Sequence, residues 1–83
     1  MIPNLRQIPV INPIQTGKNI YRLKTEQGYT AKDLQLACEL ACVQAVYFWL
    51  QGRKIPSIDN LVILAHLFGV SVDDILAVEV VDV

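Results

Sequence analysis

The 83-residue sequence has few of the residues that several functional classes require. It contains only two cysteines, Cys38 and Cys42, and one histidine, His66, which are too few for a disulfide framework or a four-ligand zinc site. Charged residues interrupt every apolar run before it reaches the roughly 18 residues that a membrane span needs. We therefore predict no metal, no cofactor and no membrane span, and we expect both cysteines to be small buried apolar residues.

Signals of secretion and of catalysis are also missing. Pro3 and Pro9 interrupt the first ten residues, so this segment is not a secretory signal peptide, and we expect a cytoplasmic protein. The sequence contains no nucleophile–base pair, phosphate-binding loop or carboxylate dyad, and we predict that the protein is not an enzyme. Hydrophobic residues make up 53% of the chain and charged residues only 18%, which predicts one small folded domain.

The charges are divided unequally along the chain. All seven basic residues lie within positions 1–54 together with three acids, whereas positions 55–83 contain five acids and no base. The net charge of −1 therefore combines a first part of +4 with a second part of −5. This asymmetry favours one face that attracts polyanions, with ordinary surface charges that happen to segregate as the alternative.

The sequence pattern divides the chain into an arm, a helical domain and a tail. Residues 1–15 contain three prolines, which predict an extended N-terminal arm. Thr16 is expected to cap a helix that runs to about Gln27. Residues 16–77 form the predicted helical domain, and the β-branched residues 78–83 form a C-terminal tail or strand. The predicted fold class is an all-α, compact bundle of four to five short helices.

Three further helix starts are marked by hydroxyl residues that serve as N-caps, two of them in capping boxes. These residues are Thr30, Ser57 and Ser71. Between Asp33 and Gln51 the residues leave two structures open, because no Gly, Pro, Ser, Asn or Thr punctuates the segment. Propensity alone permits one helix of about 20 residues there, as well as two shorter helices.

Four motifs stand at fitting separations along these elements: GKNIYRL at 17–23, WLQG at 49–52, IPSIDNL at 55–61 and GVSVDDIL at 69–76. In these motifs and in the order of its elements, the sequence resembles the Cro/repressor-type, or XRE-like, family of helix-turn-helix DNA-binding regulators. The resemblance covers about Thr16 to Leu76 and implies a lambda-repressor-like fold. It places the second helix at 30–38, the turn at 39–42 and the recognition helix at about 43–51. It also implies a bacterial or phage transcriptional regulator, expected to be a repressor that binds double-stranded DNA.

The resemblance also implies which residues contact DNA. The positions facing the major groove are Val43, Gln44, Tyr47 and Phe48. Of these, Gln44 is the best direct reader, because its amide can pair with adenine N6 and N7. Tyr47 can bond a phosphate, and the apolar side chains can pack on thymine methyl groups. The further contact residues are expected to be Thr30, Lys32, Gln51, Arg53 and Lys54.

The recognition helix departs from the family because it carries no basic residue. Relatives commonly place Lys or Arg near positions 48 and 51, where this chain has Phe48 and Gln51. Trp49 is expected to be a packing residue with Val46 on the same inner side. The alternative function is a helix-turn-helix scaffold that binds another protein through exposed Tyr47 and Phe48.

A homodimer is expected, because a single recognition helix with few cations offers little contact area and repressors of this type commonly bind as two-fold dimers. The apolar segments available for it are the arm at 8–14 and the tail at 78–83. The tail could pair as a strand with its symmetry mate or with the arm, and both segments could instead fold back on their own domain.

Overall fold

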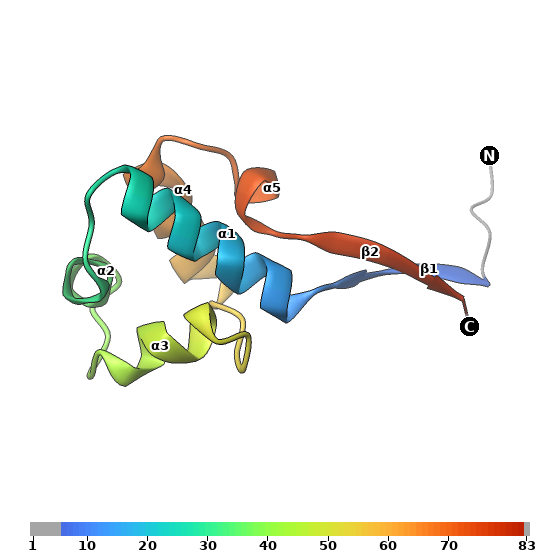
Figure 1. Cartoon of the computed structure of the whole chain (residues 1–83), viewed down its shortest axis with the longest axis horizontal. Helices are drawn as coiled ribbons and strands as arrows, with labels where there is room; N and C mark the ends of the chain where they lie inside the picture. Colours follow the sequence, from blue (N-terminus) through green and yellow to red (C-terminus); the bar gives the residue numbers. More distant parts are fainter. Residues whose placement is uncertain (1–5, 83) are drawn as a thin grey trace.

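The computed structural model describes residues 6–82, in which five helices surround one core and two strands form a ribbon that projects from it (Figure 1). The elements are β1 (Gln7–Ile11), α1 (Pro13–Glu26), α2 (Ala31–Ala37), α3 (Gln44–Leu50), α4 (Ile58–Phe68), α5 (Val72–Ile75) and β2 (Val78–Asp82). The predicted helical bundle with an extended arm and a short C-terminal strand is confirmed. Pro3, with the rest of the arm at 1–5, and Val83 lie outside the described residues.

The first helix begins earlier than predicted. Its N-cap is Asn12, whose side-chain oxygen accepts a hydrogen bond from the backbone N–H of Gln15, and Pro13 is the first helical residue. The prediction of an arm that extends to residue 15 and of a cap at Thr16 is wrong. A proline is excluded from a helix interior, but at the first helical position its missing N–H is not needed and its fixed φ suits the helix.

The other predicted helix starts are confirmed. Thr30 and Ser71 each accept a hydrogen bond from the backbone N–H three residues on, and Asp33 and Asp74 complete the two capping boxes. Ser57 caps α4 in the same way. The local hydrogen-bonding capacity of these side chains therefore sets where α2, α4 and α5 begin.

The segment that the sequence leaves open forms two helices and not one. α2 and α3 each have seven residues, and Glu39 in the turn between them adopts a left-handed conformation with φ of 52°. This conformation cannot continue a right-handed helix. Cys42 is exposed in the turn, and the N-cap of α3 is Val43, which makes no side-chain capping bond.

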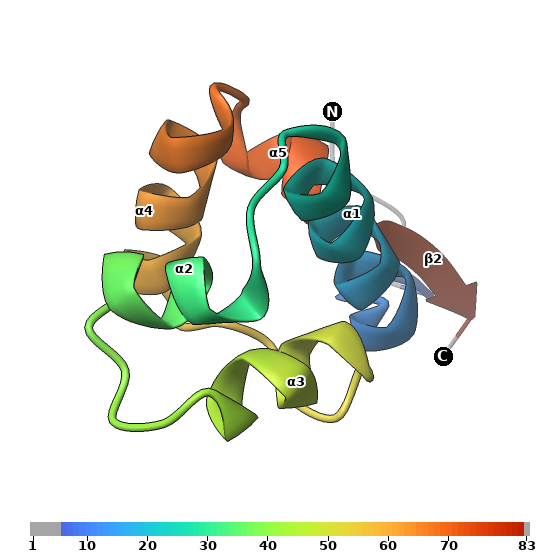
Figure 2. The ribbon, with the colours of Figure 1, turned by 60° about the vertical axis from the view of Figure 1, so that its left-hand side comes forward.

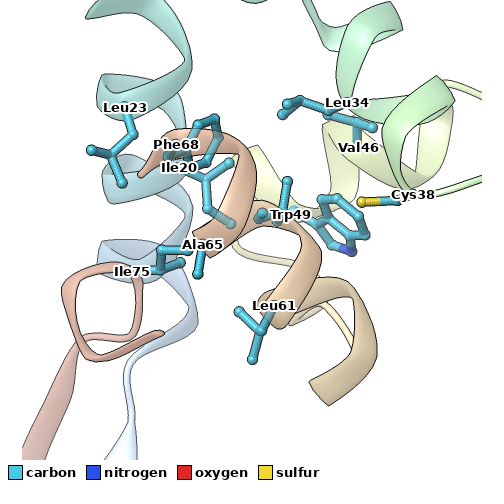
Figure 3. Packing of buried hydrophobic residues seen from close by; sticks show 11 residues of the cluster. Ile20, Leu23, Leu34, Cys38, Val46, Trp49, Leu61, Ala65, Phe68 and Ile75 are labelled. Atoms are coloured by element: carbon cyan, nitrogen blue, oxygen red, sulfur yellow. The ribbon is translucent and has the colours of Figure 1, made fainter. Parts of the chain in front are cut away.

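One apolar core joins all five helices (Figure 3). The buried apolar residues are Ile20, Leu23, Leu34, Cys38, Val46, Trp49, Leu61, Leu64, Ala65, Phe68 and Ile75. The predicted packing roles of Trp49 and Val46 are confirmed, as is the burial of Cys38. The prediction that Cys42 is also buried is wrong, because the turn directs its side chain to solvent.

The two strands pair antiparallel, from Gln7 opposite Asp82 to Ile11 opposite Val78. The tail therefore pairs with the arm of its own chain, which is one of the arrangements expected from the sequence. Ala77, at the base of the ribbon, is fixed at both polar atoms: its carbonyl oxygen accepts from the Asn12 N–H at 2.8 Å, and its N–H donates to Thr16 Oγ1 at 3.0 Å. These bonds fix the base of the ribbon to the first turn of α1.

Candidate nucleic-acid interface

α3 presents one polar, solvent-facing side and one buried side. Val46 and Trp49 are buried in the core, whereas Gln44, Tyr47 and Gln51 are exposed. Positions 44, 47 and 51 follow the i, i+3, i+7 spacing of one helix face, and at 100° per residue this face lies opposite the buried pair. The structure thus brings three of the predicted contact residues together on one face of α3. Figure 2 shows the ribbon of α3 and the turn that joins it to α2.

A glycine in α1 sets the position of α3. A Cβ on Gly17 would lie 2.9 Å from the backbone oxygen of Leu50 and even closer to that of Trp49. α1 therefore passes against the end of α3 with backbone in direct contact with backbone. The sequence motif at 17–23 contains this glycine, but its role requires the tertiary contact.

The turn between α2 and α3 is held by Gln35, a residue that sequence reasoning missed. Its side chain is only 9% exposed, and its Nε2 donates to the carbonyl oxygen of Leu40 at 3.2 Å. The Leu40 N–H in turn donates to the backbone oxygen of Gln35 at 3.0 Å. The remaining acceptor, Gln35 Oε1, receives a bond from Lys32 Nζ at 3.1 Å, so the buried amide is satisfied at both ends.

Two cations of the predicted set lie over one aromatic ring at the end of α3. The Cζ atom of Arg53 is 5.9 Å and the Nζ atom of Lys54 is 5.4 Å from the centre of the Phe48 ring. The backbone N–H groups of both residues also donate to the Phe48 carbonyl oxygen, at 2.9 and 3.3 Å. This basic loop supplies positive charge beside a helix that has none of its own.

The position of Phe48 differs from the expectation that Tyr47 and Phe48 are both exposed. Tyr47 is 42% exposed, but Phe48 is half-buried and is faced by the two cations. The alternative protein-binding surface, which needs both rings exposed, therefore has only the Tyr47 ring available. Val43, expected to face the groove, is also half-buried, at the start of the helix.

The two predicted contact residues on α2 have their polar groups engaged within that helix. Thr30 Oγ1 accepts from the Asp33 N–H at 3.1 Å, and Lys32 bonds Gln35. The backbone N–H of Thr30 donates to the Asp33 carboxylate at 2.8 Å, and the Thr30 side chain also hydrogen-bonds this carboxyl. Both bonds favour the charged form and lower the pKa of the Asp33 carboxyl below its ordinary value. The start of α2 thus carries the ionised Asp33 carboxylate next to Lys32. This negative charge offsets the positive charge that Lys32 brings to the surface.

Burial raises the pKa of the Cys38 thiol above its ordinary value, because desolvation disfavours the thiolate.

In residues 6–82 there is no group of three or more His, Cys, Asp or Glu side chains placed to hold a metal ion. The same residues enclose no pocket. None of the helices described between residues 6 and 82 is both long and apolar enough to cross a membrane.

Two short helices joined by a fixed turn, with the second one packed by its inner face and open on its outer face, define a helix-turn-helix protein. The family described as Helix-turn-helix matches residues 20–75, which is more than half of the sequence. The chain belongs to this family, as the resemblance to Cro/repressor-type proteins implies. Comparison with curated proteins gives no match.

Solved structures agree with this assignment. A transcriptional regulator from Listeria innocua superposes with a TM-score of 0.70 and 27% identity over 75% of this chain, which spans 57% of that protein. The restriction-modification controller protein C.AhdI from Aeromonas hydrophila superposes with a TM-score of 0.66 and 19% identity, and the match covers 75% of this chain and 92% of C.AhdI. The clp gene regulator ClgR from C. glutamicum superposes with a TM-score of 0.65 and 24% identity, and the match covers 89% of this chain and 86% of ClgR. The last two likenesses show the shared fold.

Proposed function

We propose that this protein is a sequence-specific DNA-binding transcriptional regulator, acting as a repressor, that reads the major groove with α3. The observation that carries the proposal is the outer face of α3, with Gln44, Tyr47 and Gln51 exposed in one row. Membership of the helix-turn-helix family and the likeness to the Listeria regulator support the class of function. A domain seated on its operator excludes other proteins from the same DNA, which is the repressor role proposed.

The proposed roles divide into base readers and phosphate partners. Gln44, exposed at the start of α3, reads a base through its amide, which can pair with adenine in a bidentate way. Arg53 and Lys54 contact phosphates beside the groove, where such contacts provide sequence-independent affinity. Phe48 acts indirectly, by holding both cations against the end of the helix.

The remaining proposed contacts lie around this centre. Tyr47 and Gln51 extend the exposed row to phosphates or neighbouring bases, and Val43 packs at the rim. At the start of α2, the Thr30 hydroxyl and the backbone N–H groups of the first helical turn contact a phosphate, while the N–H of Thr30 itself stays bonded to Asp33. Lys32 must give up its hydrogen bond to Gln35 to reach a phosphate. Its side chain is exposed to solvent and can change rotamer to do so. The DNA-bound form proposed is a two-fold homodimer, because two half-sites double a small contact area.

Selection of bound sequences from a random duplex pool, followed by titration of the selected duplex, tests the proposal. We expect one enriched motif and an affinity that falls steeply with salt. Weak binding at low salt with no enriched motif would refute the regulator function.

Two variants test the division of roles. Gln44→Ala should relax the preference at one base position, at a cost of about 1–3 kcal/mol there. Arg53→Ala with Lys54→Ala should weaken binding to all sequences and flatten the salt slope by about 2 per subunit. Arg22→Ala is the matched control, since Arg22 is an exposed cation on α1 that pairs with Glu26 and leaves the proposed surface unchanged. Identical behaviour of the Gln44 and Arg53/Lys54 variants would contradict the assignment.

A further inference from the structure

The β1–β2 ribbon leaves apolar side chains in solvent. It projects from the helical body (Figure 1), and Ile8, Ile11, Val78, Val80 and Val81 are all exposed, Val80 by 63%. A two-stranded ribbon alone is marginally stable in water, and unpaired strand edges are templates for further strands. The two outer edges of the ribbon differ in their capacity for such pairing.

Hydrogen-bond parity shows which groups of β1 face outward. The Asn12 N–H donates to Ala77 at the base of the ribbon, so the N–H groups of β1 that point toward β2 belong to Val10 and Ile8, at every second position. The intervening residues, with Pro9 at the centre, direct their backbone groups outward. Proline has no N–H, so the outer edge of β1 lacks its central donor, which is a common protection of an edge strand.

The outer edge of β2 has no such protection within the described residues. Val81 and Glu79 pair inward with β1, which leaves the N–H and C=O groups of Val78, Val80 and Asp82 on the outer edge. None of these is a proline, and β-branched residues favour the extended conformation. The sheet has two strands, so no described strand covers this edge.

We propose that the outer edge of β2 pairs antiparallel with β2 of a second copy, giving a four-stranded sheet across a two-fold axis centred on Val80. This inference rests on the homodimer of the proposed function and names its surface. In this register Val80 is opposite Val80 of the second copy, and Val78 is opposite Asp82. The three hydrogen-bonded pairs exchange about six backbone hydrogen bonds, two at each pair.

Charge and side-chain faces support a second copy as the occupant. The register places Glu79 opposite Val81 of the second copy, whereas an axis at Glu79 would put two carboxylates directly opposite each other. A two-fold axis normal to the sheet keeps each face continuous, so Val78 and Val80 with Ile11 and Pro9 form one apolar face across both ribbons. The outer edge of β2 is therefore complementary to the same edge of a second copy.

Sedimentation of the full chain and of two matched proline variants tests the edge. Val80→Pro removes an outward N–H from β2, and Gln7→Pro removes an outward N–H from β1, with circular dichroism to verify the helices. We expect a wild-type dimer, a dissociation constant raised roughly 30-fold or more by Val80→Pro, and no change with Gln7→Pro. A wild-type monomer at high micromolar concentration, or equal effects of both variants, would overturn the proposal.

Cross-linking tests the register, also where a proline variant fails to fold. In a Cys42→Ser background, Val80→Cys should form a disulfide-linked dimer under mild oxidation, because opposed residues of a hydrogen-bonded pair have Cα atoms about 5.5 Å apart. Val81→Cys, whose symmetry mate lies beyond about 7 Å, should not. A dimer that cross-links at neither position, for example one formed through exposed Ile58 and Val62 of α4, refutes this surface.

The failures of the two proposals are distinguishable. If no duplex is selected but Val80→Pro dissociates a wild-type dimer, the DNA-binding function fails and the β2 contact stands. If the selected duplex is bound and the dimer is unaffected by Val80→Pro, the function stands and the β2 contact is wrong.

Discussion

Replacing Gly17 by alanine tests whether the contact between α1 and the end of α3 fixes the position of α3. The added Cβ would lie 2.9 Å from the Leu50 oxygen and closer still to the Trp49 oxygen. Both atoms belong to the backbone, so no rotamer change removes the overlap. The two helices must move apart, and the core contacts on either side are loosened.

The magnitude follows from two opposing effects. Alanine favours the helix by about 1 kcal/mol relative to glycine, whereas forcing an extra methyl group into a packed contact costs about 1–3 kcal/mol. Because two backbone oxygens are overlapped, we take the upper end of the cost and expect a net loss of about 2 kcal/mol in the free energy of unfolding. For a domain of this size the loss lowers Tm by roughly 8–16 °C.

Urea titration followed by fluorescence of Trp49, the single tryptophan, measures the effect. Thr25→Ala, at an exposed position of the same helix, is the control, because it gains helix propensity without a new contact. DNA binding measured where both variants are fully folded should be weakened by Gly17→Ala and unchanged by Thr25→Ala. A Gly17→Ala protein as stable as the wild type, or more stable, would refute the reasoning.

Four other outcomes are expected. Glu39→Gly should raise the free energy of unfolding by about 0.5–1 kcal/mol, because it relieves the left-handed strain at φ 52°, whereas Glu39→Ala should not; equal urea midpoints would contradict this. Asp33→Asn should flatten the loss of stability in acid: the folded-state pKa of Asp33 is lowered, so its stabilisation is present above the unfolded pKa and is lost below about pH 4, as Tm against pH would show. Phe48→Leu should weaken DNA binding about five-fold with little change in Tm, since two cation–π contacts are lost; an unchanged affinity in fluorescence anisotropy would count against the role of the ring. In the native protein iodoacetamide should modify Cys42 alone, and Cys38 only after unfolding, because burial raises the pKa of its thiol; two adducts in the native mass spectrum would contradict this.

Local signals were sufficient for most of the fold. Thr30, Ser57 and Ser71 cap helices through bonds that reach only three residues along the chain, so the sequence pattern contains them fully. The predicted start of α1 is wrong because Pro13 is excluded from a helix interior but suits the first helical position, and the sequence pattern does not distinguish the two. Separation of α2 from α3 could not be derived from propensity and came only from family resemblance, because Gln35 and the core impose it.

The candidate site was predictable in its positions and not in its organisation. Helical spacing alone puts Gln44, Tyr47 and Gln51 on one face once the helix is placed. The stacking of Arg53 and Lys54 on Phe48 depends on how the chain turns after α3, which no spacing rule predicts. The sequence therefore predicts an exposed Phe48, whereas in the structure both cations lie over its ring.

The first turns of α1 contact the ribbon on one side and α3 on the other. Asn12 and Thr16 bind Ala77 on the ribbon side, and one residue further along Gly17 touches the end of α3. In the proposed dimer this short path of direct contacts is expected to set the distance and angle between the two α3 helices. One base pair inserted between two half-sites rotates one against the other by about 34°, since B-DNA turns once in about 10.5 base pairs. If the proposed dimer cannot follow that rotation, it should distinguish operators by the spacing of their halves as well as by their bases.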